Sequence, residues 1–143
     1  MKITGNNQQS TSFGSTLAIW KPDATKRGLV KPLNNLLKEN GFEILQSWQG
    51  KAPIEKLEKH YAEHQGKSFF NELINSMREG DIFVAEIEKK NSPDDVKEYR
   101  DLVKNVIRPT YAVDLTRNTA HSSSEKMSAL QEIKLWFGEI LGK

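Results

Sequence analysis

The most restrictive stretch of the chain is Ser15-Thr16-Leu17-Ala18-Ile19-Trp20, which contains no charged side chain. A strand without charge on either face is typical of the middle of a sheet that is covered on both sides. The turn-rich loop Lys21–Gly28 follows it directly. We therefore expect helices packed against a sheet and a loop at the end of a central strand, a position where ligands commonly bind.

Patterns typical of helices and of strands alternate along the rest of the chain. Apolar residues at helical spacing predict helices over 29–40, 54–64, 70–79, 92–103 and 130–137. Further strands are predicted over 42–48, 81–87 and 111–115, the last from the alternation of Tyr111, Val113 and Leu115. If the paired helices in the middle count as one insertion, the order is β-α-β-β-α-β. The predicted fold is an α+β, ferredoxin-like βαββαβ sandwich with helices packed on a four-stranded antiparallel sheet.

Composition limits the classes of protein that remain. A chain of 143 residues is long enough for one domain, which we place at residues 15–143 after a flexible leader at 1–14. The absence of cysteine excludes disulfides and thiol chemistry, and no apolar run approaches the roughly 20 residues of a membrane span. We expect a cytoplasmic protein. A net charge of +2 gives no support to nucleic-acid binding.

The segment Arg117-Asn118-Thr119-Ala120-His121-Ser122-Ser123-Ser124 has the chemistry of a phosphate-handling nucleophile. Imidazole is both largely neutral and nucleophilic near pH 7, so it can accept and release a phosphoryl group. The serines are expected to cap the following helix, whose free N–H groups suit anionic oxygens. The alternative is a surface histidine that happens to lie beside a helix start.

Basic side chains elsewhere fit the same chemistry. Lys21 follows the first strand. Arg100 lies on the helix that begins at Ser92, and Arg108 precedes the last predicted strand. With Arg117, they carry enough positive charge to spread over a triphosphate, which has about four negative charges. Each of them alone is equally consistent with a solvated surface charge.

These motifs resemble those of the nucleoside diphosphate kinase family. The resemblance runs from Thr16 to Phe137, with the motifs in the family's order. The segments that carry it are Ala18–Asp23, Arg27–Val30, His60-Tyr61, Phe69-Phe70, Ile107-Arg108, Arg117–Ser123, Glu132-Ile133 and Leu135–Phe137.

The resemblance implies a role for each matching side chain. His121 corresponds to the nucleophile that takes the γ-phosphoryl group of a nucleoside triphosphate as phosphohistidine and passes it to a nucleoside diphosphate, with ping-pong kinetics. Glu132 corresponds to the carboxylate that orients this ring, and Ser123 to the hydroxyl beside it. The matches to nucleotide-binding residues are Lys21 and Tyr61 near the γ-phosphate, Asn118 at the ribose 3′-hydroxyl, Arg100 and Arg108 at the phosphates, and Phe69 and Leu115 on the two faces of the base.

The resemblance also implies ligands and partners. Nucleoside di- and triphosphates are the expected ligands, and Mg²⁺ is expected to bind through their phosphates with few or no protein ligands. We expect a homo-oligomer, either a dimer or an assembly built from dimers, and neither a membrane nor a specific nucleic acid as partner. His60 and His64 lie four residues apart, a spacing that suits a metal, but no third ligand is evident nearby, so no protein-held metal is expected.

The chain departs from the family between Arg100 and Arg108. The segment 101–107 is shorter than in most members and lacks their Gly-x-Thr-Asn-Pro stretch. The threonine that would touch phosphate therefore has no clear counterpart, and Lys104 or Thr110 are the candidates to replace it.

Two other interpretations remain open at this point. The missing loop is consistent with a weakly active or non-catalytic nucleotide-binding regulatory module on the same fold. Ser122, where members usually have glycine, is a further departure. A single-strand nucleic-acid binder that uses Trp20 and Trp48 is the other interpretation, and the small net charge argues against it.

Overall fold

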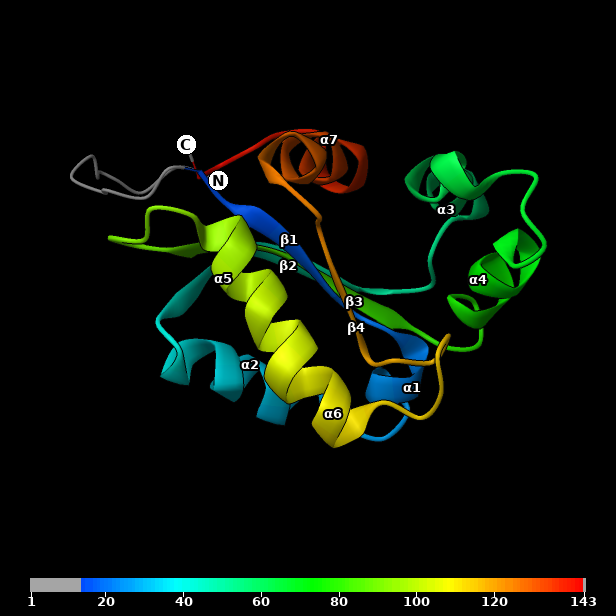
Figure 1. Cartoon of the computed structure of the whole chain (residues 1–143), viewed down its shortest axis with the longest axis horizontal. Helices are drawn as coiled ribbons and strands as arrows, with labels where there is room; N and C mark the ends of the chain where they lie inside the picture. The colour runs from blue at the N-terminus through cyan, green and yellow to red at the C-terminus, as the bar shows by residue number, and fades with distance from the viewer. Residues whose placement is uncertain (1–13, 143) are drawn as a thin grey trace.

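The structure, a computed structural model, describes residues 14–142, and within them four strands form one antiparallel sheet (Figure 1). The spatial order is β2-β3-β1-β4, the arrangement of the predicted ferredoxin-like fold. Apart from Gly14, the predicted leader lies outside the described residues. The strands are β1 (Thr16–Trp20), β2 (Phe42–Gly50), β3 (Ile82–Lys89) and β4 (Ala120–Ser122).

Helices cover both faces of this sheet. In Figure 1, α2, α5 and α6 lie on one side of it, and α7 lies on the other. None of the helices within residues 14–142 is long and apolar enough to cross a membrane. The helices are α1 (Pro22–Thr25), α2 (Val30–Glu39), α3 (Ile54–His60), the 3₁₀-helix η1 (Ala62–His64), α4 (Phe70–Ser76), α5 (Asp95–Leu102), the π-helix η2 (Val103–Ile107), α6 (Arg108–Tyr111) and α7 (Lys126–Phe137).

The first strand is buried on both faces, as its lack of charge predicts. Alternate residues of β1 enter two separate apolar clusters, with Leu17 and Ile19 on the side of α3 and α7 and Ala18 and Trp20 on the side of α2 and α5. Trp20 is 0% exposed. Trp20 therefore cannot be a stacking residue of the nucleic-acid interpretation, because a ring enclosed in the core cannot stack on a base.

The fourth strand is not where the sequence pattern placed it. Residues 111–115 form no strand: Tyr111 ends α6, and Leu115 is 96% exposed in the loop that follows. β4 instead pairs with β1, with His121 opposite Ile19. The alternation of apolar residues at 111–115 does not make a strand, because this segment has no strand to pair with. Ala120–Ser122 pairs with the edge of β1 instead. His121 therefore lies within the sheet rather than in a loop after it.

Two predicted helix starts also differ. α5 is capped by Asp94, whose side chain accepts a hydrogen bond from the backbone N–H of Lys97, whereas Ser92 accepts one from the N–H of Asp94. α7 begins after Glu125 without a side-chain cap, because Ser122 is used in β4 and the serine cluster ends before the helix. The predicted serine caps are therefore wrong.

A buried carboxylate joins the two ends of the described chain. Glu86, in β3, is 0% exposed and accepts hydrogen bonds from Ser15 Oγ and from the backbone N–H of Gly142 at 3.0 Å. Gln46 Nε2 donates to the other carboxylate oxygen at 2.8 Å. The start of β1 and the segment after α7 are therefore held to the same strand.

Candidate active site

The centre of the site is the imidazole of His121 on β4. Its Nε2 lies 2.8 Å from Glu132 Oε1 on α7, and Ser123 Oγ donates to the same oxygen at 2.6 Å. The hydroxyl of Tyr99 donates to the backbone carbonyl of His121 at 3.2 Å. A neutral ring that donates from Nε2 keeps its lone pair on Nδ1. The contacts thus bring together the predicted nucleophile, carboxylate and hydroxyl, and leave Nδ1 as the nucleophilic nitrogen.

Glu132 is held in its charged form. Although burial acts to raise its pKa, the hydrogen bond and charge of His121 outweigh that effect, and with the hydrogen bond from Ser123 they lower the pKa of Glu132 to about 2. The carboxylate is therefore ionised near neutral pH. A negative charge at this position fixes the proton on Nε2 and stabilises positive charge that develops on the ring when Nδ1 forms a bond.

A second imidazole lies against the first. The ring centroids of His60 and His121 are 4.4 Å apart, and Trp136 Nε1 donates to His60 Nδ1 at 3.0 Å. Burial, and then the proximity of His121, lower the pKa of His60 to about 3. His60 is therefore neutral, with its proton on Nε2.

The two histidines and Glu132 form the one group of three potential metal ligands found within residues 14–142. A metal would need a lone pair on His60. Its Nδ1 already accepts from Trp136, and its Nε2 then carries the proton. The geometry therefore favours ordered hydrogen bonds over a metal at this position.

Lys21 is enclosed rather than solvated. It is 6% exposed, and its Nζ donates to Asn118 Oδ1 at 2.8 Å and to the backbone carbonyl of Thr116 at 3.2 Å. Burial, with a smaller contribution from the positive charge of Arg108, lowers the pKa of Lys21 to about 8. A partly desolvated ammonium group of this kind interacts strongly with an anionic ligand.

Arg108, which lies near Lys21, carries a buried hydrogen-bond donor. Its guanidinium donates to the backbone carbonyl of Ala120 at 2.9 Å, but Nε is buried and has no hydrogen-bond partner in the described part of the chain. Burial lowers the pKa of Arg108, and it lies close enough to Tyr61 for their charges to interact. Tyr61 is 8% exposed, and burial raises its pKa. A buried, unpaired guanidinium donor is what a phosphate oxygen would satisfy.

The other two arginines lie farther from this centre. Arg100 donates to the backbone carbonyl of Ser124. Arg117 Nε and one terminal nitrogen bind both carboxylate oxygens of Glu79 at 2.9 and 2.5 Å, and its contact with phosphate stays a prediction. A further nitrogen of Arg117 reaches Asp114 at 3.3 Å. It anchors the loop before β4 to the segment after α4.

The two side chains predicted to hold the base are exposed, and their contact with a base stays a prediction. Phe69, just before α4, is 43% exposed, and Leu115 is the most exposed large hydrophobic residue described. Phe70, the neighbour of Phe69, packs against the core instead. Lys104 and Thr110 are both exposed on η2 and α6, and their proposed substitution for a phosphate-binding threonine stays a prediction.

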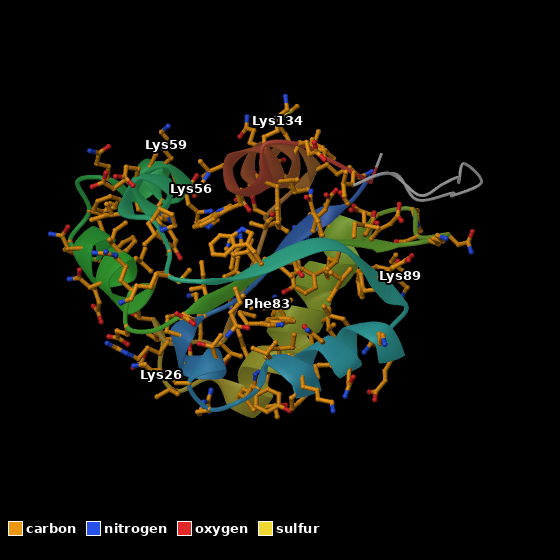
Figure 2. All side chains as sticks on the ribbon, turned by 180° about the vertical axis from the view of Figure 1, so that it is seen from behind. Lys26, Lys56, Lys59, Phe83, Lys89 and Lys134 are labelled. Carbon is orange, nitrogen blue, oxygen red and sulfur yellow. The ribbon has the colours of Figure 1, made fainter. Side chains whose placement is uncertain are left out.

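A polar pocket of about 340 Å³ adjoins the histidine–carboxylate pair between α3 and α7. His60 and Glu132 line it together with Lys59 and Gln131. Lys56 joins the two helices by donating to the backbone carbonyl of Leu135 at 2.6 Å, and Figure 2 shows it beside α7. Glu132 therefore faces a pocket with a largely polar lining as well as His121.

Two residues near the centre were given no role from the sequence. Asp23 Oδ1 and Oδ2 accept from the backbone N–H and the hydroxyl of Thr119, at 3.2 and 3.0 Å. The sequence feature that could have indicated a role for Asp23 is its place directly after Lys21-Pro22 in the motif. Its partner is 96 residues away along the chain, and sequence spacing does not reveal such a pair.

A sheet that carries a histidine backed by an ionised carboxylate, near a buried lysine and a partly buried arginine, is the arrangement expected of a phosphotransferase. The chain belongs to the nucleoside diphosphate kinase family, whose family model matches residues 14–140. This agrees with the resemblance drawn from the motifs.

Individual relatives support the same assignment. The nucleoside diphosphate kinase of Caldanaerobacter subterraneus subsp. tengcongensis is 37% identical over 132 residues, which cover 88% of this chain and 95% of the relative. That of Histophilus somni is 35% identical over 133 residues, covering 87% and 92%. Among solved structures, a halophilic nucleoside diphosphate kinase from Halobacterium salinarum in complex with CDP superposes with a TM-score of 0.80 at 26% identity, covering 87% of this chain and 88% of that one. The enzyme from Encephalitozoon cuniculi also gives a TM-score of 0.80, at 28% identity and 89% and 90% coverage.

Proposed function

We propose that the chain transfers the γ-phosphoryl group of a nucleoside triphosphate to a nucleoside diphosphate through a phosphohistidine at Nδ1 of His121. The observation that carries the proposal is the contact between His121 Nε2 and Glu132 at 2.8 Å, which leaves Nδ1 as the nucleophile. The lone pair on Nδ1 attacks the terminal phosphorus, the bond between that phosphorus and the bridging oxygen breaks, and the nucleoside diphosphate leaves. The second nucleotide then reverses the step.

The surrounding residues take complementary roles in this proposal. Lys21 and Arg108 neutralise phosphate oxygens, supported by the burial of Lys21 and by the buried, unpaired Nε of Arg108. Tyr61 orients the γ-phosphate, and Asn118, already bonded to Lys21, binds the ribose 3′-hydroxyl. Arg100 binds phosphate farther out, and Phe69 and Leu115 hold the base between them. A site that holds the base by stacking, without hydrogen bonds to the edge of the base, accepts many bases, so we expect little selectivity among nucleosides.

A divalent cation accompanies the nucleotide in this family, and we propose Mg²⁺. This ion prefers oxygen ligands in octahedral geometry and keeps several waters. The one three-ligand group in residues 14–142 contains two imidazoles and suits it poorly. Phosphate oxygens of the nucleotide are the better ligands, and the bound ion would neutralise part of their charge.

We also propose a homo-oligomer built from dimers, located in the cytoplasm with its nucleotide substrates. β2 lies at one edge of the sheet, and an edge strand offers unpaired backbone groups to a second copy. A pocket of about 590 Å³ that includes Leu37 and Phe42 adjoins this edge between α2 and β2. Light scattering after size exclusion tests the proposal, and a monomer at micromolar concentration would contradict it.

Labelling with [γ-³²P]ATP tests the mechanism. The wild-type chain is expected to acquire an acid-labile, base-stable label that is absent from His121→Ala and retained by His64→Ala, a matched histidine outside the central pair. Equal labelling of the wild type and His121→Ala would contradict the assignment. Addition of unlabelled GDP then separates enzyme from regulatory module, because an enzyme passes the label to GDP whereas a module retains it.

A further inference from the structure

Thr119, two residues before His121, has a backbone conformation that threonine rarely adopts. Its φ is 76°, and across it the N–H of Ala120 donates to the carbonyl of Asn118 at 2.8 Å. This is the rare, strained form of the γ-turn. For a β-branched residue a positive φ is a true outlier, which persists only when the surroundings impose it.

The surroundings of Thr119 are well suited to impose this conformation. Its carbonyl accepts from the backbone N–H of Lys21 at 2.8 Å, and its N–H and hydroxyl both donate to the carboxylate of Asp23 at 3.2 and 3.0 Å. Thr119 is 0% exposed. All its polar groups are therefore bonded to Lys21 and Asp23, at the start of α1.

Asp23 is directed toward this turn rather than toward a ligand. Its side chain is 6% exposed, and Arg27 donates to its Oδ2 at 3.1 Å. Both carboxylate oxygens are thus engaged by protein groups. A carboxylate so enclosed would not meet nucleotide phosphates, which it would also repel.

The turn lies between two side chains that the proposed reaction uses. Asn118 precedes it and bonds Lys21 through Oδ1, whereas His121 follows it in β4. A γ-turn reverses the chain within three residues, so its geometry sets the separation of the amide from the imidazole. Displacement of a reacting group by about 1 Å can lower a rate on the order of 100-fold.

We propose that Asp23 is a positioning residue that holds the strained turn at Thr119 and thereby sets the location of His121 and Asn118 relative to the bound nucleotide. The proposal rests on His121 as the nucleophile. It explains why a buried acid lies next to the lysine of a site that binds anions.

The test is a rescue experiment. Asp23→Ala is expected to lower the single-turnover rate of His121 phosphorylation by ATP on the order of 10- to 100-fold, with a smaller loss of affinity for ADP through the displaced Asn118. Glycine adopts positive φ without a steric penalty, so adding Thr119→Gly to Asp23→Ala should restore the rate to within about fivefold of the wild type. Because the glycine also relieves strain in the folded state, the rates are compared at a temperature at which thermal melting shows every variant to be folded.

Single substitutions at Thr119 provide a second measurement in case Asp23→Ala folds poorly. Thr119→Val keeps the shape of threonine but loses the hydroxyl bond and retains the strain, whereas Thr119→Gly removes the strain. The proposal requires His121 to be phosphorylated by ATP faster in the glycine variant than in the valine variant. Loss of packing alone would give the opposite order, because glycine removes the whole side chain. Asp95→Ala is the matched control, because Asp95 is 1% exposed and accepts from the backbone N–H of Lys89.

The outcomes separate this inference from the proposed function. If the wild type carries no label on His121, the proposed function fails. If His121 is labelled but Asp23→Ala reacts at the wild-type rate, the positioning role alone is overturned. A folded double variant that stays as slow as Asp23→Ala, or a valine variant faster than the glycine variant, overturns it as well.

Discussion

The inner part of the site and its outer rim are built differently. The inner part consists of Lys21, Asn118, His121 and Glu132, which are joined in pairs by hydrogen bonds of 2.8 Å. The rim consists of Phe69 and Leu115, which are 43% and 96% exposed. In the proposed mechanism the chemistry depends on groups that are fixed before a nucleotide arrives, whereas the base would meet exposed side chains that are free to adapt. Substitutions in the inner part should act on kcat, and those in the rim on KM.

The largest effect is expected at Glu132. Glu132→Gln removes the negative charge that stabilises the ring of His121 as a bond forms at Nδ1, so kcat should fall about 100-fold or more. Steady-state kinetics with ATP and GDP measure the change, with Glu125→Gln, an exposed acid just before the same helix, as the matched control. An unchanged kcat would show that the inner part does not depend on this charge.

A pH effect is expected at Lys21. Burial first, and then Arg108, lower its pKa to about 8, so the ammonium charge is complete below that pH and is lost as pH rises through it. kcat/KM should therefore fall about tenfold per pH unit above pH 8, well before an ordinary lysine would titrate. In Lys21→Arg the falling limb should move to higher pH. A limb at the same pH in both proteins would assign it to another group.

A smaller effect is expected at Phe69. Loss of base stacking in Phe69→Ala should raise KM about fivefold and leave kcat nearly unchanged, because one face of the base loses its partner. Lys67→Ala is the control, since Lys67 Nζ lies 5.9 Å from the centre of the Phe69 ring but does not offer a stacking surface. A fall in kcat without a change in KM would remove the distinction between rim and inner part.

The smallest effect is expected at Leu115. Because it is 96% exposed, Leu115→Ala should not change the melting temperature and should raise KM by only about twofold. Steady-state kinetics and thermal melting are the measurements. A tenfold loss of kcat would mean that this loop helps to place Asn118, whose side-chain amide donates to the carbonyl of Leu115 at 3.2 Å.

Local features of the structure follow from the sequence because they depend on local chemistry. The charge-free segment before Lys21 is the buried central strand, and the residues around His121 carry the family resemblance that the comparisons confirm. The pairing of Glu132 with His121 was accessible only through that resemblance, since the carboxylate lies on a different element.

Features that depend on distant partners could not be predicted in this way. β4 is three residues long and is defined by its pairing with β1, whereas the longer alternation at 111–115 has no strand to pair with. Arg117 was assigned to phosphate because its charge fits, but Glu79 binds it from 38 residues away. Trp20 has an aromatic ring of the kind that stacks on bases, but its position in β1 buries that ring in the core.

The carboxylate of Glu86 has a consequence for engineering the chain. Because Ser15 Oγ and the N–H of Gly142 bond the same side chain, the two ends of the described domain lie within a few ångströms of each other. A short peptide linker could therefore join them without crossing the catalytic face. Circular permutants opened in an exposed turn should retain the sheet, as proteins with adjacent termini generally do.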